Sequence, residues 1–372
     1  MNDEVEIGRG KRGRRAYSFD EVAVVPTRRT RDPRDVSLSW QFDAYYMKIP
    51  VMGAPMDSVM SPENAIKLGK LGGIGVLDLE GLWTRYEDPL PFYEELTRLD
   101  QTSANVTAKL QEIYAEPVKP DLMATRLEEI KAADVIVAGA MSPAGTQKLW
   151  EAVAEAPLDV FVVRGSTVSA DHVSSQAEPL NLKQFIHHLD IPVIVGGVAT
   201  YTGALHLMRT GAAGVLVGFG GGAASTTRRT MGIHVPMATA VADVAAARRD
   251  FMDESGGRYV HVIADGGIGL SGDIVKAIAC GADAVMLGTA LARASEAPGN
   301  GWHWGSEAHH STLPRGSRVE VGTVGTLEQV LFGPADNAEG TLNLMGALRR
   351  TMATTGYTDV KELQRVGVVI GY

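Results

Sequence analysis

Short runs of apolar and β-branched residues recur along the chain, and most of them end in glycine or a small polar residue. Roughly eight runs have the length of a buried strand. Wholly apolar strands are typical of parallel sheets covered on both faces, and eight of them suit a closed barrel. The runs span residues 49–55, 72–78, 133–140, 159–166, 191–198, 213–219, 259–267 and 282–289.

The segments between these runs carry apolar residues three and four positions apart, which predicts helices. Residues 61–71 begin with a serine in the position of an N-cap. Strands that alternate with helices imply right-handed βαβ units, so the pattern predicts an α/β protein, a (β/α)8 TIM barrel. A doubly wound open sheet is the alternative, and the number of strands favours the barrel. Further helices are expected in residues 142–156, 199–212 and 271–282.

Two regions exceed a minimal barrel, and we expect residues 1–372 to form one domain. Residues 82–130 follow the second strand as a long acidic, partly helical excursion. Residues 295–340 follow the eighth strand and are rich in Gly, Pro, His and Trp, which predicts a long loop, and loops of this length are usually functional lids or disordered. Residues 337–357 then predict a helix that packs back on the barrel.

Composition narrows the classes of function. Of the 372 residues, 45% are hydrophobic, and the formal net charge is −9, which argues against generic binding of nucleic acid or membrane surfaces. The basic residues 8–15 are interpreted as a solvated arm. The single cysteine, Cys280, suits a reducing cytosol, and we expect it on the buried apolar face of a helix. No apolar run approaches the roughly 18 residues of a membrane span, so a cytoplasmic protein is expected.

The last two predicted strands end in glycine-rich loops, at the end of a barrel where chemistry gathers. Asp265, Gly266 and Gly267 end the seventh strand, and Gly288 and Thr289 end the eighth. Glycine lets backbone amides approach an anion, and each loop leads into the N-terminus of a helix. The loops therefore predict a phosphate site, and the Asp265 carboxylate suits the two hydroxyls of a ribose. Turn glycines beside a capping aspartate are the alternative.

The loop after the sixth strand, "GFGGGAASTTRRTMG" (218–232), holds more glycine than packing requires. Because glycine loses the most entropy on ordering, such a loop indicates close contact with a ligand, or motion. Arg228 and Arg229 are expected to hold phosphate or to pair with acids on the surface. A cysteine in place of Ser225 would be activated by neighbouring amides and arginines.

Several segments together resemble the IMP dehydrogenase / GMP reductase family, in the form without the regulatory CBS pair, over most of the chain. The family oxidises IMP to XMP with NAD, or reduces GMP to IMP with NADPH, through a bond between a loop cysteine and purine C2. The resemblance therefore implies IMP, XMP or GMP as ligands, NAD as cofactor, and a homotetramer or higher oligomer. The matching segments are "YSFDEVAVVP" (17–26), "APMDSVM", "GGIGVLD", "GFGGGAASTTR", "ADGGIGLSGDIVKAIACGADAVMLG" and "GALRRTMATTGYTDVKELQ".

The resemblance also implies roles for individual residues. Ser225 and Thr227 fall on the catalytic loop, and Arg164 falls where the cofactor is met. Backbone carbonyls of this loop correspond to half of a potassium site, and a neighbour's C-terminal tail supplies the other half. The implied substrate residues are Met56 near the purine, Asp265 on the ribose, Gly266, Gly267, Gly288 and Thr289 on the phosphate, and Trp304 and Gly305 at the base edge; the potassium residues are Gly220, Gly222 and Ser225.

The chain departs from the family where the chemistry is done. Ser225 replaces the catalytic cysteine, and a serine hydroxyl is not ionised at neutral pH, whereas a thiol partly is. An oxygen nucleophile needs a positioned base, and the sequence indicates none beside Ser225. Arg164 replaces the aspartate that meets the nicotinamide ribose, Ala223 replaces a phosphate-binding serine, and Gly197 replaces an asparagine.

The resemblance also implies that residues 295–340 supply a mobile flap over the site. The Arg–Tyr pair that activates water in the family's flap is not found, and the local residues are His309 and His310. A histidine can act as a base at neutral pH, but two adjacent loop histidines are also typical of a solvated surface. Two functions stay open: a weak or altered oxidoreductase of the family type, and a purine-nucleotide-binding paralogue that acts by regulation or assembly. A barrel aldolase or isomerase would need a lysine or paired carboxylates at strand ends, which the sequence does not indicate.

Overall fold

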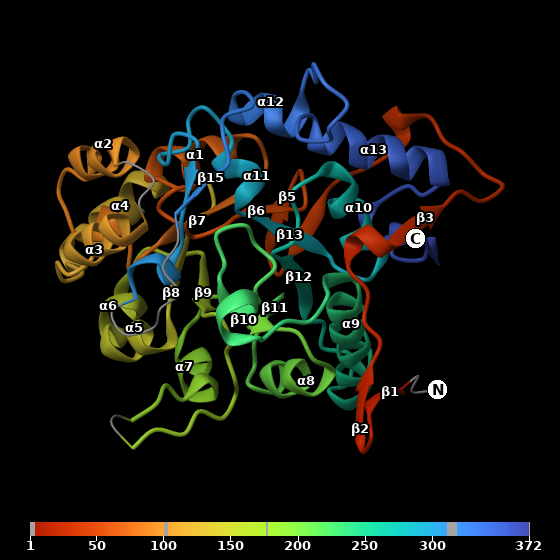
Figure 1. Cartoon of the computed structure of the whole chain (residues 1–372), viewed down its shortest axis with the longest axis horizontal. Coiled ribbons are helices and arrows are strands. Elements are labelled where there is room, and N and C mark those ends of the chain that lie inside the picture. The colour runs from red at the N-terminus through yellow and green to blue at the C-terminus, as the bar shows by residue number, and fades with distance from the viewer. Residues whose placement is uncertain (1–3, 100–102, 176–177, 311–317, 372) are drawn as a thin grey trace.

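Eight parallel strands close into a barrel in the computed structural model, which describes residues 4–99, 103–175, 178–310 and 318–371 (Figure 1). Neighbouring strands follow the order of the chain, and the last pairs with the first, which excludes the open sheet. Each strand overlaps one of the apolar runs. The strands are β6 (Val51–Gly53), β7 (Ile74–Asp78), β8 (Ala138–Met141), β9 (Val160–Arg164), β10 (Val193–Val198), β11 (Gly214–Val217), β12 (His261–Asp265) and β13 (Ala284–Leu287).

Alternate residues of each strand build two apolar layers. In β7, Ile74 and Val76 are buried inside the barrel, whereas Leu77 packs outward under the helices. A hairpin of β4 (Trp40–Phe42) and β5 (Tyr45–Met47) adds its buried side chains to the inner layer. Burial on both faces is why these strands carry continuous apolar runs rather than an alternating pattern.

Helices surround the barrel, and their ends follow local sequence signals. The Ser61 hydroxyl accepts the Asn64 amide at 3.1 Å and so caps the first helix, as predicted. The helix predicted over 142–156 is broken in two, because Leu149 leaves the helical region at φ −114°. The helices are α1 (Pro62–Lys70), α5 (Pro143–Lys148), α6 (Trp150–Glu155), α7 (Leu182–His188), α8 (Tyr201–Arg209), α9 (Met237–Glu254), α10 (Ser271–Ala279), α11 (Thr289–Ala292), α13 (Leu344–Thr355) and α14 (Val360–Leu363).

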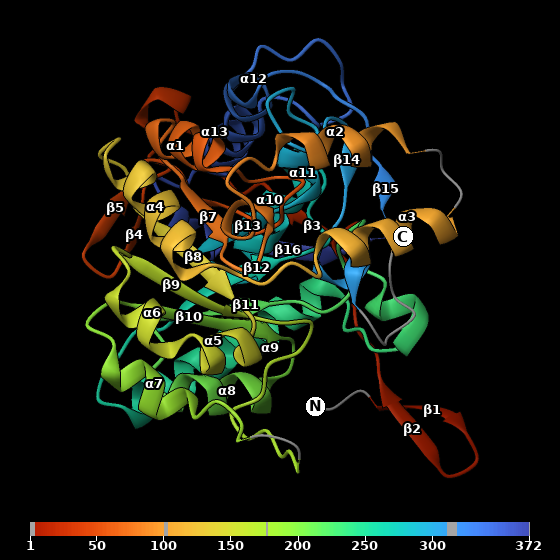
Figure 2. The ribbon, with the colours of Figure 1, turned by 90° about the vertical axis from the view of Figure 1, so that its left-hand side faces the viewer.

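The two additions to the barrel lie beside each other. The excursion comprises the 3-10 turn η3 (Leu82–Thr84), α2 (Leu90–Arg98), α3 (Ser103–Ile113) and α4 (Pro120–Lys131), so it is mostly helical. The predicted long loop is wrong in part, because 295–340 pairs its own backbone in β14 (Trp302–His303), the turn η5 (Ser306–His309), β15 (Val319–Glu320) and α12 (Leu327–Phe332). Figure 2 shows β14 and β15 next to α2 and α3. The mobility of this segment stays a prediction, and residues 311–317 lie outside the described residues.

Both ends of the chain form two-stranded sheets outside the barrel. The hairpin of β1 (Glu4–Gly8) and β2 (Lys11–Arg14) carries the basic arm and projects away from the body in Figure 2. Near the C-terminus, β16 (Gly367–Ile370) pairs antiparallel with β3 (Val22–Val25). Helix α13 packs on α10, as predicted from the sequence. In the described part of the chain, no helix has both the length and the apolar character to cross a membrane.

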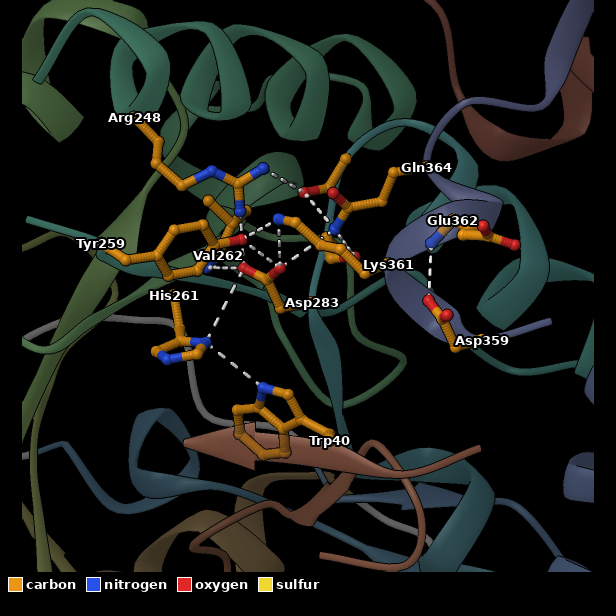
Figure 3. A network of polar contacts seen from close by, with 12 residues as sticks. Trp40, Arg248, Tyr259, His261, Val262, Asp283, Asp359, Lys361, Glu362 and Gln364 are labelled. Atoms are coloured by element: carbon orange, nitrogen blue, oxygen red, sulfur yellow. Dashed lines mark hydrogen bonds and ion pairs between the residues drawn. The ribbon is translucent and has the colours of Figure 1, made fainter. Parts of the chain in front are cut away.

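A buried carboxylate, Asp283, ties the C-terminal segment to the barrel just before β13 (Figure 3). Its Oδ2 accepts Arg248 Nη1 at 2.6 Å and the Val262 amide at 2.8 Å. Its Oδ1 accepts Tyr259 Oη at 2.6 Å and Gln364 Nε2 at 3.0 Å. The carboxylate therefore joins α9, β12 and the residues after α14.

Candidate functional site

A cavity of about 980 Å³ lies at the carboxyl ends of the barrel strands, where the sequence places the chemistry. The residues to which the resemblance assigns roles come from distant parts of the chain, and all of them except Trp304 line this one cavity. Its lining includes Met56, Arg164, Gly220, Gly222, Ser225, Thr227, Asp265, Gly266, Gly267, Gly288, Thr289 and Gly305.

The loops after β11 and β12 meet face to face, and their glycines are required. Gly266 and Gly267 have φ values of +104° and +68°, a region that L side chains avoid. A Cβ on Gly221 would lie 3.0 Å from the Gly267 amide nitrogen, so a side chain there would push the loops apart. Thr289 begins α11, whose first amides have no partner within the helix. This wall has the backbone character of an anion site.

Arg164 and Asp265, predicted to meet different ligands, pair with each other. Arg164 Nε lies 3.2 Å from Asp265 Oδ2, with 27% and 15% of the two side chains exposed. Burial alone would lower the pKa of Arg164, but the charges of Asp265, Asp78 and Glu307 outweigh it and raise the pKa above its ordinary value. A ribose diol would have to share Asp265 with this guanidinium or displace it.

Glu307, from η5, supplies a carboxylate that the sequence analysis missed. Its Oε1 accepts Thr227 Oγ1 at 2.6 Å and Ser166 Oγ at 2.8 Å. Its Oε2 accepts the Thr226 amide at 2.8 Å and Ser225 Oγ at 3.4 Å. The conclusion that no base stands beside Ser225 is therefore wrong. Nothing in the local sequence around Glu307 signals this contact, which joins residues about eighty positions apart.

The prediction that Trp304 meets the edge of the base is wrong, because its side chain does not line the cavity. Only 1% of the residue is exposed, and Trp304 Nε1 donates to Tyr114 Oη at 3.0 Å. The Ser58 hydroxyl also donates to the Trp304 carbonyl at 2.9 Å. The neighbouring Gly305 does line the cavity, and a Cβ on it would lie 2.8 Å from Met56 Cε. The buried Trp304 side chain holds the backbone here in place, and the absence of a side chain at Gly305 leaves room for Met56.

The two loop arginines lie on the surface, which agrees with the second of the two alternatives that the sequence left open for them. Arg228 and Arg229 are exposed, belong to a π-helical turn, Thr227–Met231, and do not line the cavity. A carboxylate, that of Glu307, contacts the Ser225 hydroxyl.

The two adjacent histidines after β14 are not simply solvated. His309 and His310 both line the cavity, and the His309 ring stacks on Tyr114 with centroids 3.8 Å apart. Burial, aided by the Arg85 charge, lowers the pKa of His309 to about 4. Burial and the Arg164 charge do the same to His303, a cavity residue that the sequence analysis missed. At neutral pH the rings of His309 and His303 are therefore uncharged.

Cys280 offers no alternative nucleophile, and nothing in the structure tests the potassium residues. Cys280 is the C-cap of α10 rather than part of its interior; it is half-buried, and burial raises its pKa to about 11. The Gly222 carbonyl already accepts the Ser225 amide at 3.1 Å, and the potassium site stays a prediction. Among the described residues, no group of three or more His, Cys, Asp and Glu could hold a metal ion.

A closed (β/α)8 barrel with a glycine-rich, polar cavity at the carboxyl ends of its strands defines a TIM-barrel protein. The family model for the IMP dehydrogenase / GMP reductase domain matches residues 16–370. The chain belongs to this family, which confirms the resemblance seen in the sequence.

Proteins similar to the chain over nearly its whole length include an uncharacterized oxidoreductase of Mycolicibacterium smegmatis, 51% identical over 99% of this chain and 100% of the relative. An inosine-5'-monophosphate dehydrogenase of Methanocaldococcus jannaschii is 27% identical over 94% of this chain and 91% of the relative. The crystal structure of an IMP dehydrogenase/GMP reductase-like protein from Corynebacterium glutamicum superposes with a TM-score of 0.93, at 46% identity, over 99% of this chain and 98% of that chain.

Proposed function

We propose that this protein is a purine-nucleotide oxidoreductase that binds IMP, XMP or GMP at the barrel mouth and acts at purine C2 with NAD. The observation that carries the proposal is the Glu307 carboxylate on the hydroxyls of Ser225 and Thr227. A carboxylate beside a hydroxyl is the general base that an oxygen nucleophile requires. Because a serine hydroxyl is a poorer nucleophile than a thiolate, we expect slow turnover.

The residues of the chain divide the work as follows. Glu307 takes a proton from Ser225, directly or through Thr227, whose hydroxyl lies 3.5 Å from that of Ser225. Gly266, Gly267, Gly288 and Thr289 would hold the phosphate, and Asp265 the ribose. The Ser225 oxygen would bond to C2 as the hydride leaves, and NAD, when bound, would accept that hydride. Water would then replace Ser225 at C2, which releases XMP and returns a proton to the serine. Arg164 stands at the position that would meet it, and its charge is balanced by nearby carboxylates.

A second candidate is a purine-nucleotide-binding protein without catalysis, with a regulatory or assembly role. The Arg164–Asp265 ion pair favours it, because the position that meets the cofactor in the family now holds an arginine engaged with the ribose residue. The two candidates share the nucleotide and differ in the need for Ser225.

One comparison separates the two candidates. Calorimetry measures IMP binding, and NADH formation from IMP and NAD measures turnover, in the wild type, Ser225→Ala and Glu307→Gln. Ser306→Ala is the matched control, since Ser306 lines the same cavity next to Glu307. Turnover lost in the first two variants and kept in the control supports the oxidoreductase. IMP binding without turnover in any of them supports the second candidate.

We expect IMP to bind and inosine not to bind, because the phosphate would meet the two glycine turns. Asp265→Ala should weaken IMP binding by about 1–3 kcal/mol, the cost of leaving hydroxyl partners unmet. Arg164→Gln should instead strengthen it, since the ribose would no longer compete with the guanidinium for Asp265. Calorimetry checks all three, and equal affinities for inosine and IMP would remove the phosphate assignment.

We also propose a homotetramer or higher oligomer, by likeness to the family. Three exposed apolar residues of β16, Val368, Val369 and Ile370, support an association surface near the C-terminus. Light scattering on the eluting protein measures the mass, and a monomeric mass at micromolar concentration would contradict the proposal.

A further inference from the structure

The segment that carries Glu307 is held from outside the barrel by the helical excursion. Gln111 Nε2, on α3, donates to the His310 carbonyl at 2.9 Å. Arg318, beyond the cavity, donates through Nη2 to the Leu99 carbonyl at 2.8 Å and stacks over Trp302 at 3.8 Å. Figure 2 shows this neighbourhood as α2 and α3 against β14 and β15. The excursion therefore contacts this part of the chain at His310 and at Arg318, on either side of residues 311–317.

Tyr114, which directly follows α3, makes the most concentrated of these contacts. Its hydroxyl donates to Asp57 Oδ2 at 2.6 Å and accepts Trp304 Nε1 at 3.0 Å. Its ring lies parallel to that of His309, with 2° between the planes. One buried side chain thus touches the segment three residues before Glu307 and two residues after it.

The Tyr114 hydroxyl is itself fixed from the barrel side. Asp57 follows β6 and is 3% exposed, and its Oδ2 also accepts the Leu82 amide at 2.9 Å. Met56, the preceding residue, lines the cavity. Hydrogen bonds to a buried carboxylate are stronger than those between neutral groups, so the hydroxyl has a rigid support.

We infer that Tyr114 is a positioning residue of the site: it fixes the segment Trp304–His309 so that Glu307 rests on the Ser225 loop. Tyr114 touches neither Glu307 nor the loop in any contact described above, and it acts through Trp304 and His309. The helical excursion then helps to position a residue of the site, in addition to covering the barrel. The inference rests on the proposed function only for what Glu307 does chemically.

The test uses Tyr114→Phe, which removes the hydroxyl and keeps the ring that stacks on His309. Tyr86→Phe is the matched control, because the Tyr86 hydroxyl donates to the Ile113 carbonyl at 2.8 Å within the same excursion. Urea unfolding compares the global stability of the variants. Hydrogen exchange of the peptide covering residues 303–310 reports local opening, which a purely structural role would not single out.

In Tyr114→Phe, exchange in residues 303–310 should rise about tenfold, equivalent to about 1.4 kcal/mol in the opening equilibrium. IMP affinity should fall by less than tenfold, because the apparent affinity scales with the fraction of molecules in which the segment is in place, and a tenfold rise in opening lowers that fraction by at most tenfold. Neither should change in Tyr86→Phe. Unchanged exchange in Tyr114→Phe, or an equal rise in both variants, overturns the inference. A wild type that fails to bind IMP would refute the proposed function, and the exchange comparison would still decide the role of Tyr114.

Discussion

The Ser225→Cys variant is expected to carry a thiol that Glu307 keeps protonated, so that it is alkylated slowly at neutral pH. The Glu307 carboxylate lies 3.4 Å from Ser225 Oγ, and a nearby negative charge disfavours a thiolate. Adding Glu307→Gln should raise the alkylation rate about tenfold at pH 7, as a fall of about one unit in thiol pKa predicts. Intact mass after timed exposure to iodoacetamide measures both rates.

Two thiols serve as references in this experiment. Cys280, with its pKa raised to about 11 by burial, should stay unmodified over the same time. Ala223→Cys places a thiol in the same loop at an exposed position that lines the cavity, and Glu307→Gln should leave its rate unchanged. IMP should protect the new thiol at position 225. Equal rates with and without Glu307→Gln would show that the carboxylate does not control this position.

The Asp283→Ala variant is expected to lose about 3–5 kcal/mol of unfolding free energy, because it leaves the Arg248 guanidinium buried without its partner. Both side chains are 5% exposed, and the carboxylate also holds Tyr259 and Gln364. Urea denaturation gives the difference from a shift in midpoint at constant slope. The residues that converge on Asp283 are visible in Figure 3.

Asp243→Ala is the matched control, since Asp243 pairs with Arg14 on the surface, where 46% of the arginine side chain is exposed. It should cost no more than about 1 kcal/mol. A similar cost in both variants would show that burial adds nothing at Asp283. If Asp283→Ala does not fold, Asp283→Asn keeps the shape of the side chain and should still cost more than the control.

The pH dependence of this effect follows from the pKa of Asp283. Burial alone would raise that pKa, but the charges of Arg248, Lys361 and His261 outweigh it and hold the pKa below its ordinary value. A carboxyl with a lowered folded pKa contributes stability above the unfolded pKa, near about 3.9, and loses it as pH falls through the folded pKa. The difference between wild type and Asp283→Asn should therefore be constant from about pH 8 to about pH 5 and shrink below about pH 4.

The sequence by itself determined the barrel and the location of the site. Apolar runs identify strands because burial on both faces leaves no room for polar alternation, and eight runs became β6 to β13. The glycines after β12 could be singled out in the sequence because local backbone geometry requires them, as the left-handed φ values of Gly266 and Gly267 show. These features depend on neighbours in the chain, and a linear pattern records them.

Only the tertiary structure decided which polar groups meet. Arg164 and Asp265 are hydrogen-bonded although 101 positions separate them in the sequence. Glu307 and Ser225 are 82 positions apart. The Trp304 side chain bonds to Tyr114, 190 positions away, instead of lining the cavity. Each partner is selected by the path of a distant segment and by the need to satisfy a buried polar group, neither of which leaves a periodic signal. Most residues of the candidate site could thus be predicted from the sequence. Which of them pair, and that the Glu307 carboxylate lies beside Ser225, depends on how the excursion packs against the segment after β13.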